Sequence, residues 1–200
     1  MTLWQADIAN KQRAFLNAVN AVDFEKSLPN RIFGEKWKIF LFFQSDYIFS
    51  SGFVEFIREL LCFERAEVAC MLNLDQTETL AFEAASAIFI DKTVSDGDYQ
   101  EKLRAGGPAA GWLFGVDRYV CASDIGRWCI YSEKSNDVAV VGLCESDDQG
   151  RFVEIMNAVS AKSIEDLVDG GRFPLFPFDQ LVPEWRKGLL ENYGVADKER

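Results

Sequence analysis

The chain has 200 residues, a length typical of one generous domain, and we expect a single domain over residues 1–200. Hydrophobic residues make up 48% of it and include 17 Phe, which supplies a core and argues against intrinsic disorder. The formal net charge is −11, with 32 acidic residues against 21 basic ones. Affinity for nucleic acids and for anionic membranes comes largely from Lys and Arg, so this charge disfavours both and favours a basic protein partner.

Histidine is absent from the chain, and this excludes several kinds of site. Ser-His-Asp and Cys-His nucleophile systems cannot be built, and neither can zinc or iron sites that need histidine. The five cysteines are scattered without a Cys-x-x-Cys pair, so we expect no metal and no cofactor. The first residues lack the features of a signal peptide, and no apolar run approaches the ~20 residues that span a bilayer. We therefore expect a cytoplasmic protein with free thiols.

The N-terminal part of the chain predicts two amphipathic helices around a strand. Apolar residues recur at spacings of three, four and seven over residues 3–22, which predicts a helix. Residues 37–43 are aromatic and β-branched, as is typical of a buried strand, although their periodicity is also compatible with a short helix. Residues 52–63 follow the i, i+3, i+4, i+7 pattern of a second helix, for which Ser50 or Ser51 is the expected cap.

A strand comes next, followed by a stretch with two interpretations. Strict alternation over residues 66–74 predicts a strand with one buried face. Over residues 76–90, the capping-box spacing of Asp75 and Glu78 favours a helix, whereas the apolar run at 88–90 favours a strand.

The strongest structural signal is a group of three strand-like runs, over residues 112–122, 127–133 and 137–144. The linkers between them, Ser-Asp-Ile-Gly and Lys-Ser-Asn, are turn sequences, so we expect an antiparallel meander. The polar stretch 93–107 before it holds a short helix at most. Helices and strands are partly segregated along the chain, which favours an α+β fold. We expect an antiparallel sheet that includes the meander (about 112–144) and is packed by amphipathic helices.

The C-terminal part predicts short helices around an irregular segment. The helices are expected over residues 148–158, 163–168 and 183–192, with Pro183 at a favourable first position. The sequence Phe-Pro-Leu-Phe-Pro-Phe at 173–178 excludes regular structure, because its alternate prolines remove backbone donors.

Few residues have the spacing of a known chemical motif. The glycine-rich stretch 106–112 lacks the ending of a P-loop and the spacing of a dinucleotide fingerprint, so we interpret it as a loop. Asp96, Asp98, Asp147 and Asp148 could hold Mg²⁺ only if they converged on a cleft.

Two cysteines flank the first turn of the meander. If that turn centres on residue 125, Cys121 and Cys129 lie directly opposite each other on paired strands. In a reducing cytoplasm we interpret them as small apolar residues that fill one face of the sheet.

The meander is the candidate binding surface. Trp128 and Ile130 share one of its faces, and Cys129 and Tyr131 share the other. Aromatic residues beside arginines are the composition enriched at interface hot spots, and the Phe-Pro segment offers a further apolar patch. The predicted binding residues are Arg118, Arg127, Trp128, Tyr131 and Phe176.

Three functions are compatible with these features. The preferred hypothesis is a non-catalytic acidic domain that binds a basic protein, for example a bacterial immunity protein that neutralises a toxin. The second is an enzyme that uses carboxylates, with or without Mg²⁺. The third is a structural subunit that associates with itself through its apolar loop or a sheet edge.

Overall fold

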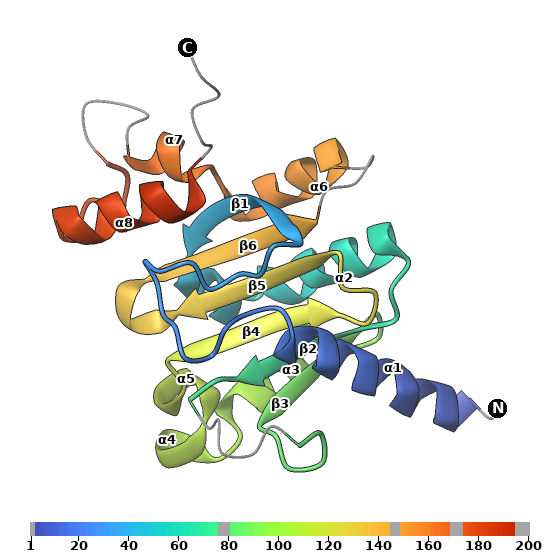
Figure 1. Ribbon diagram of the computed structural model, residues 1–200. Helices are drawn as coiled ribbons and strands as arrows, with labels where there is room; N and C mark the ends of the chain where they lie inside the picture. Colours follow the sequence, from blue (N-terminus) through green and yellow to red (C-terminus); the bar gives the residue numbers. More distant parts are fainter. Residues whose placement is uncertain (1–2, 76–80, 145–148, 169–173, 195–200) are drawn as a thin grey trace.

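The computed structural model of the protein describes residues 3–75, 81–144, 149–168 and 174–194. In these residues a six-stranded antiparallel sheet, in the order β1-β6-β5-β4-β2-β3, lies between two layers of helices (Figure 1). The predicted α+β fold with an antiparallel sheet is confirmed. None of the described helices combines the length and the hydropathy that crossing a membrane requires.

Helices and strands occupy most of the described chain. The strands are β1 (Trp37–Gln44), β2 (Val68–Asn73), β3 (Ala87–Asp91), β4 (Arg118–Ser123), β5 (Trp128–Glu133) and β6 (Val138–Cys144). The α-helices are α1 (Leu3–Val19), α2 (Gly52–Glu64), α3 (Asp96–Arg104), α4 (Gly107–Ala110), α5 (Trp112–Gly115), α6 (Gln149–Met156), α7 (Ile164–Val168) and α8 (Pro183–Tyr193). Short 3₁₀ helices are η1 (Ser45–Phe49), η3 (Lys134–Asn136) and η4 (Asn157–Val159).

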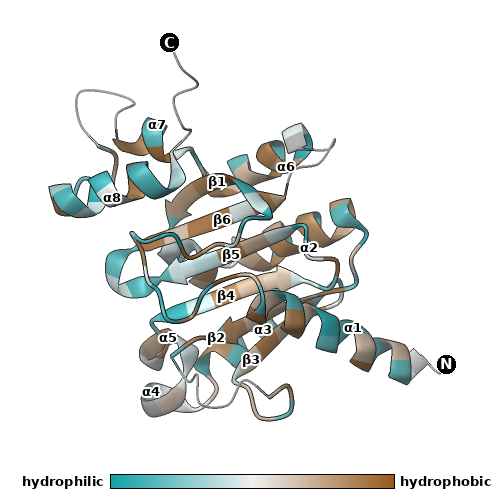
Figure 2. Cartoon of the chain, viewed as in Figure 1, coloured by the Kyte–Doolittle hydropathy of each residue, from teal (hydrophilic) through white to brown (hydrophobic). Residues whose placement is uncertain are grey.

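The sheet separates two hydrophobic cores, because successive residues of each strand point to opposite faces. One core lies against α2, α3, α5 and α6, and the other lies against α1, α7 and α8. Figure 2 shows hydrophobic colours concentrated in the sheet between these layers. Every residue of β2 is buried, so our expectation of one buried face over residues 66–74 is wrong. A strand covered on both faces is a nearly continuous apolar run rather than an alternation of polar and apolar residues, and Val68–Asn73 fits that description.

The predicted meander is confirmed as β4, β5 and β6, paired antiparallel in chain order. The register between β4 and β5 differs from our expectation by one residue. Ala122 lies opposite Cys129, and Cys121 lies opposite Ile130. A shift of one residue moves a side chain to the other face of a sheet. Cys121 therefore lies in the α2 core and Cys129 in the α1 core, and the prediction that they face each other is wrong.

Two other segments differ from their predicted conformations. Residues 112–115 form α5 instead of the beginning of a strand, and the buried ring of Trp112 packs 6.2 Å from that of Tyr119. An apolar run of this length does not distinguish a buried helical turn from a strand. In the ambiguous stretch the apolar run forms β3, residues 81–85 form turns and a bend instead of a helix, and residues 76–80 lie outside the described residues.

Candidate functional site

Two of the predicted binding residues lie inside the protein. Trp128 is buried in the α2 core and Tyr131 in the α1 core, where the Tyr131 hydroxyl donates a hydrogen bond to Glu133 Oε1 (2.7 Å). All residues of β5 are buried, because helices cover both faces of the sheet. The meander thus offers no exposed face at these positions, which corrects our expectation of a binding surface there.

The two predicted arginines lie at opposite ends of the meander. Arg118 begins β4 and contacts Asp75 through its side chain (Nε to Oδ1, 3.3 Å), while its other nitrogens donate to backbone carbonyls of Phe24 and Leu74. Arg127 is exposed beside the turn between β4 and β5. The structure does not bring the two arginines together, and the contacts of Arg118 hold loops against the sheet.

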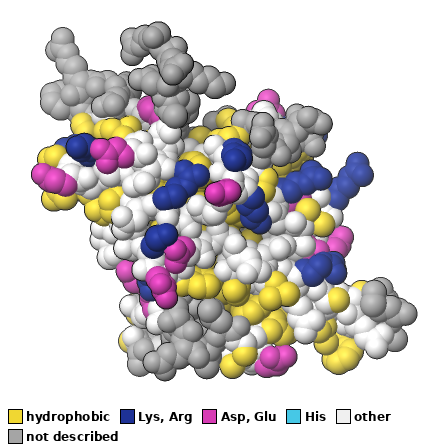
Figure 3. Space-filling view, viewed as in Figure 1, with side chains coloured by type: hydrophobic (Ala, Val, Ile, Leu, Met, Phe, Trp, Pro, Cys, Tyr) yellow, Lys and Arg dark blue, Asp and Glu magenta, His cyan; other side chains and the backbone are white. Residues whose placement is uncertain are grey.

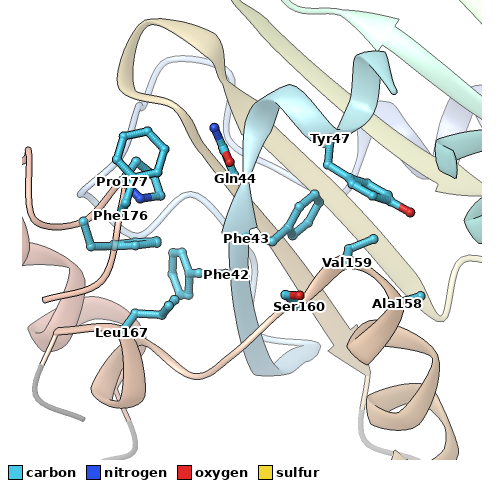
Figure 4. A pocket seen from close by; sticks show the side chains of 11 residues that line it. Phe42, Phe43, Gln44, Tyr47, Ala158, Val159, Ser160, Leu167, Phe176 and Pro177 are labelled. Atoms are coloured by element: carbon cyan, nitrogen blue, oxygen red, sulfur yellow. The ribbon is translucent and has the colours of Figure 1, made fainter. Parts of the chain in front are cut away.

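Phe176 is the predicted binding residue that lies on a surface cavity. Its side chain is 58% exposed, and it lines a groove of about 320 Å³ that we call the β1 groove. The groove crosses the outer edge of β1 (Figure 4). Phe42, Leu167, Phe176 and Pro177 lie on one side of the strand, whereas Phe43, Tyr47 and Val159 lie on the other.

The β1 groove is built by segments that are distant in the sequence. Lys162 pairs with Phe42 at the strand edge through two backbone hydrogen bonds of 2.7 and 3.0 Å. Residues 174–182, which we call the C-terminal strap, contact α7, where the Leu175 N–H donates to the Leu167 carbonyl (2.9 Å). Phe178 is buried, with its ring 6.1 Å from that of Phe42. The strap is thus fixed at Leu175 and Phe178, while Phe176 between them stays exposed.

The chain segments that contribute to the groove are acidic in sequence. The three segments that bound it, residues 44–47, 157–168 and 174–182, carry the carboxylates of Asp46, Glu165, Asp166 and Asp179 and a single cation, Lys162. Burial, together with the nearby Glu59 carboxylate, raises the pKa of Tyr47 at one wall of the groove. This makes the phenol a weaker acid than an ordinary tyrosine, which favours a hydrogen-bonding role over proton transfer. The described lining holds only Tyr47 and Ser160 hydroxyls and the Gln44 amide as polar side chains, with no carboxylate, amine or thiol.

Carboxylates elsewhere in the described residues have structural roles. Glu64 accepts hydrogen bonds from the Ser123 hydroxyl and the Arg127 N–H, and so holds the turn between β4 and β5. Asp124 accepts from the N–H groups of Glu67 and Val68, at 2.9 and 3.2 Å. Buried carboxylates need such donors, because an unpaired buried charge is costly. The carboxylates of Glu64 and Asp124 therefore stabilise local backbone structure.

The carboxylates of the enzyme hypothesis do not form a described cluster. Asp98 closes a capping box with Ser95 at the beginning of α3, and Asp96 lies in the same turn. Asp147 and Asp148 lie outside the described residues. Within the described ranges no group of three or more Cys, Asp or Glu side chains has the arrangement of a metal site.

Comparison with known proteins adds no relative: no family model matches the chain, and no curated protein or solved structure matches it either. The prolines near Phe176 mark this residue in the sequence, but no sequence signal marks the groove. Its part on β1 lies more than a hundred residues before its parts on the turn after α6 and on α7, and these segments have no shared motif.

Proposed function

We propose that the protein is a non-catalytic binding domain that holds a basic, partly apolar segment of a partner protein in the β1 groove. The observation that carries the proposal is an apolar cavity with an exposed aromatic side chain, built by segments that are rich in carboxylates. Aromatic anchors in pockets dominate the binding energy of many interfaces. Carboxylates around such an anchor speed the encounter with a basic partner and penalise acidic ones.

A bacterial immunity protein that neutralises a basic toxin is one concrete form of this proposal. It is supported by the small size and the net charge of −11. These features fit such a role by analogy. The β1 groove is the surface at which binding of a partner can be tested.

The test is selection of a random peptide library displayed on phage against the whole chain, after depletion on a Phe176→Ser variant. We expect the enriched peptides to combine Lys or Arg with aromatic or aliphatic residues. Phe176→Ala should weaken the binding of an enriched peptide by about tenfold or more, as the loss of an aromatic anchor does.

A matched control is available on the same chain. Phe114 on α5 is 62% exposed and lies away from the β1 groove, so Phe114→Ala should leave peptide binding unchanged. Enrichment of acidic peptides, or equal loss in the Phe114 and Phe176 variants, would contradict the proposal. The double variant Asp166→Asn, Asp179→Asn should lower the association rate mainly at low salt.

A further inference from the structure

The other edge of the sheet, β3, has backbone groups that point away from the sheet. The described pairing of β3 is with β2 alone. The Asn73 N–H donates to the Ser86 carbonyl (2.9 Å), and hydrogen-bonded positions alternate along an antiparallel pair. Ile88 and Ile90 therefore bond to β2, whereas the N–H and C=O groups of Ala87 and Phe89 point outward.

One outward carbonyl confirms this orientation. Lys102 on α3 donates from its Nζ to the Phe89 carbonyl (3.3 Å), an acceptor that in a wider sheet would receive the N–H of a further strand. The exposed lysine thus occupies the place of a strand donor, and it does so with a single flexible side chain.

A groove follows this edge. Its volume is about 500 Å³, and its floor includes four consecutive residues, from Ser86 to Phe89. Ala105, Ala110 and Trp112 line it on the side of α3 to α5, and Lys11 of α1 lines it as well. We call it the β3 groove. Figure 3 shows apolar side chains gathered on the molecular face between α1 and β3.

The charge of the β3 groove is opposite to that of the whole chain. Two lysines, Lys11 and Lys102, line it, and none of its described lining residues is acidic. Lys11 also forms an ion pair with Asp7 (2.7 Å), which is not part of the lining. Asp91 at the end of β3 also interacts electrostatically with Lys11, and Asp98 does so with Lys102. Exposed interactions of this kind contribute little, so both ammonium groups can also interact with carboxylates of a bound segment.

We propose that the β3 groove binds an extended acidic segment of a protein, which pairs with Ala87 and Phe89 as a seventh strand. Main-chain hydrogen bonds give affinity in this mode of recognition, and side chains at alternate positions give specificity. Carboxylates of the bound segment would lie near Lys11 and Lys102. The surface is separate from the β1 groove and has the opposite charge preference.

A second copy of the chain fits this edge less well. Two β3 edges paired with each other would bring the Lys11 and Lys102 side chains of both copies to one interface, and like charges there destabilise it. The β1 edge is not available for a continuous sheet either, because Lys162 already pairs with Phe42.

The test uses fluorescence anisotropy with the whole chain and labelled peptides in which Glu alternates with Val. We expect these peptides to bind and peptides of alternating Lys and Val not to bind. The double variant Lys11→Glu, Lys102→Glu should weaken the binding by about tenfold or more. Methylation of alternate peptide amides should also abolish it, since a strand loses its donors in this way.

Two protein variants separate the possible outcomes. Ala87→Pro removes an outward N–H that β2 does not use, and an edge strand tolerates such a change, so the variant should keep its melting temperature but bind more weakly. Phe176→Ala should bind the Glu-Val peptides like the unchanged chain, so this test and the test of the β1 groove fail independently. Absence of binding, equal binding of methylated peptides, or a dimer that Ala87→Pro dissociates in sedimentation would overturn the proposal.

Discussion

The two edges of the sheet are protected in different ways. At β1 the chain covers its own edge: Lys162 pairs with Phe42, and the C-terminal strap packs Phe178 beside it. At β3 the edge keeps outward backbone groups, and Lys11 and Lys102 lie beside it. Covering an edge and placing Lys on it are both known means of preventing aggregation. The covered β1 edge forms a side-chain pocket, whereas the β3 edge leaves backbone groups available for hydrogen bonds to another strand.

The largest effect is expected for Phe42→Ala at the covered edge. Phe42 is fully buried, and its ring lies 6.1 Å from that of Phe178 and 5.5 Å from that of Tyr193. Its truncation should lower the free energy of unfolding in urea by about 3–5 kcal/mol. Phe89→Ala at the other edge, where the ring is only partly buried, should cost clearly less. Equal losses would mean that the strap contributes no packing to the β1 edge.

A smaller loss is expected for Lys162→Pro, which removes the N–H that donates to the Phe42 carbonyl. Leaving that acceptor without its partner should cost about 1–3 kcal/mol, whereas Lys162→Ala keeps the N–H and should be nearly neutral. Hydrogen exchange followed by NMR sharpens the test. In the unchanged chain the Phe42 amide, which donates to the Lys162 carbonyl, should exchange slowly, and the Ala87 and Phe89 amides should exchange fast. Slow exchange at Ala87 and Phe89 would show that the β3 edge is covered.

The smallest effect is expected for Glu64→Gln, which touches neither edge and serves as a reference. Burial raises the pKa of Glu64 above its ordinary value of 4.5, and hydrogen bonds from Ser123 and Arg127 offset this only in part. The folded state therefore binds the proton more tightly than the unfolded state. The resulting stability is present below pH 4.5 and is lost as the pH rises through the folded-state pKa.

Glutamine cannot ionise, so the variant should lack this pH-dependent loss. Urea midpoints of both chains from acidic to neutral pH measure it, and the difference should change in favour of Glu64→Gln as the pH rises. Parallel curves for the two chains would contradict the assignment of a raised pKa.

Much of the fold was predictable because the patterns were local. The residues of β1 and α2 and the turns of the meander have the spacing that their elements require. The position of α5 was not predictable, since an apolar run such as Trp-Leu-Phe fits a buried helix and a buried strand equally well. The faces of Cys121 and Cys129 depended on a register that the turn residues alone did not determine.

The candidate sites were less predictable than the fold. Phe176 was visible as an aromatic residue next to a proline. Trp128 and Tyr131 were assigned to a surface because aromatic residues beside arginines are enriched at interfaces, but they lie on opposite faces of the sheet and both faces are covered. The β3 groove had no signal at all. Lys11 and Lys102 come from different helices, and the outward direction of the β3 main chain follows from pairing rather than from composition.

Buried thiols lie on both faces of the sheet, so their chemical modification can report local opening of each core. Cys121 lies in the α2 core and Cys70 and Cys129 in the α1 core, and burial raises the pKa of each. Cys62, in contrast, is exposed. An alkylating reagent should modify Cys62 at once and the three buried cysteines only through fluctuations of the native state. Mass spectrometry of the modified sites would then give a separate opening rate for each side of the sheet.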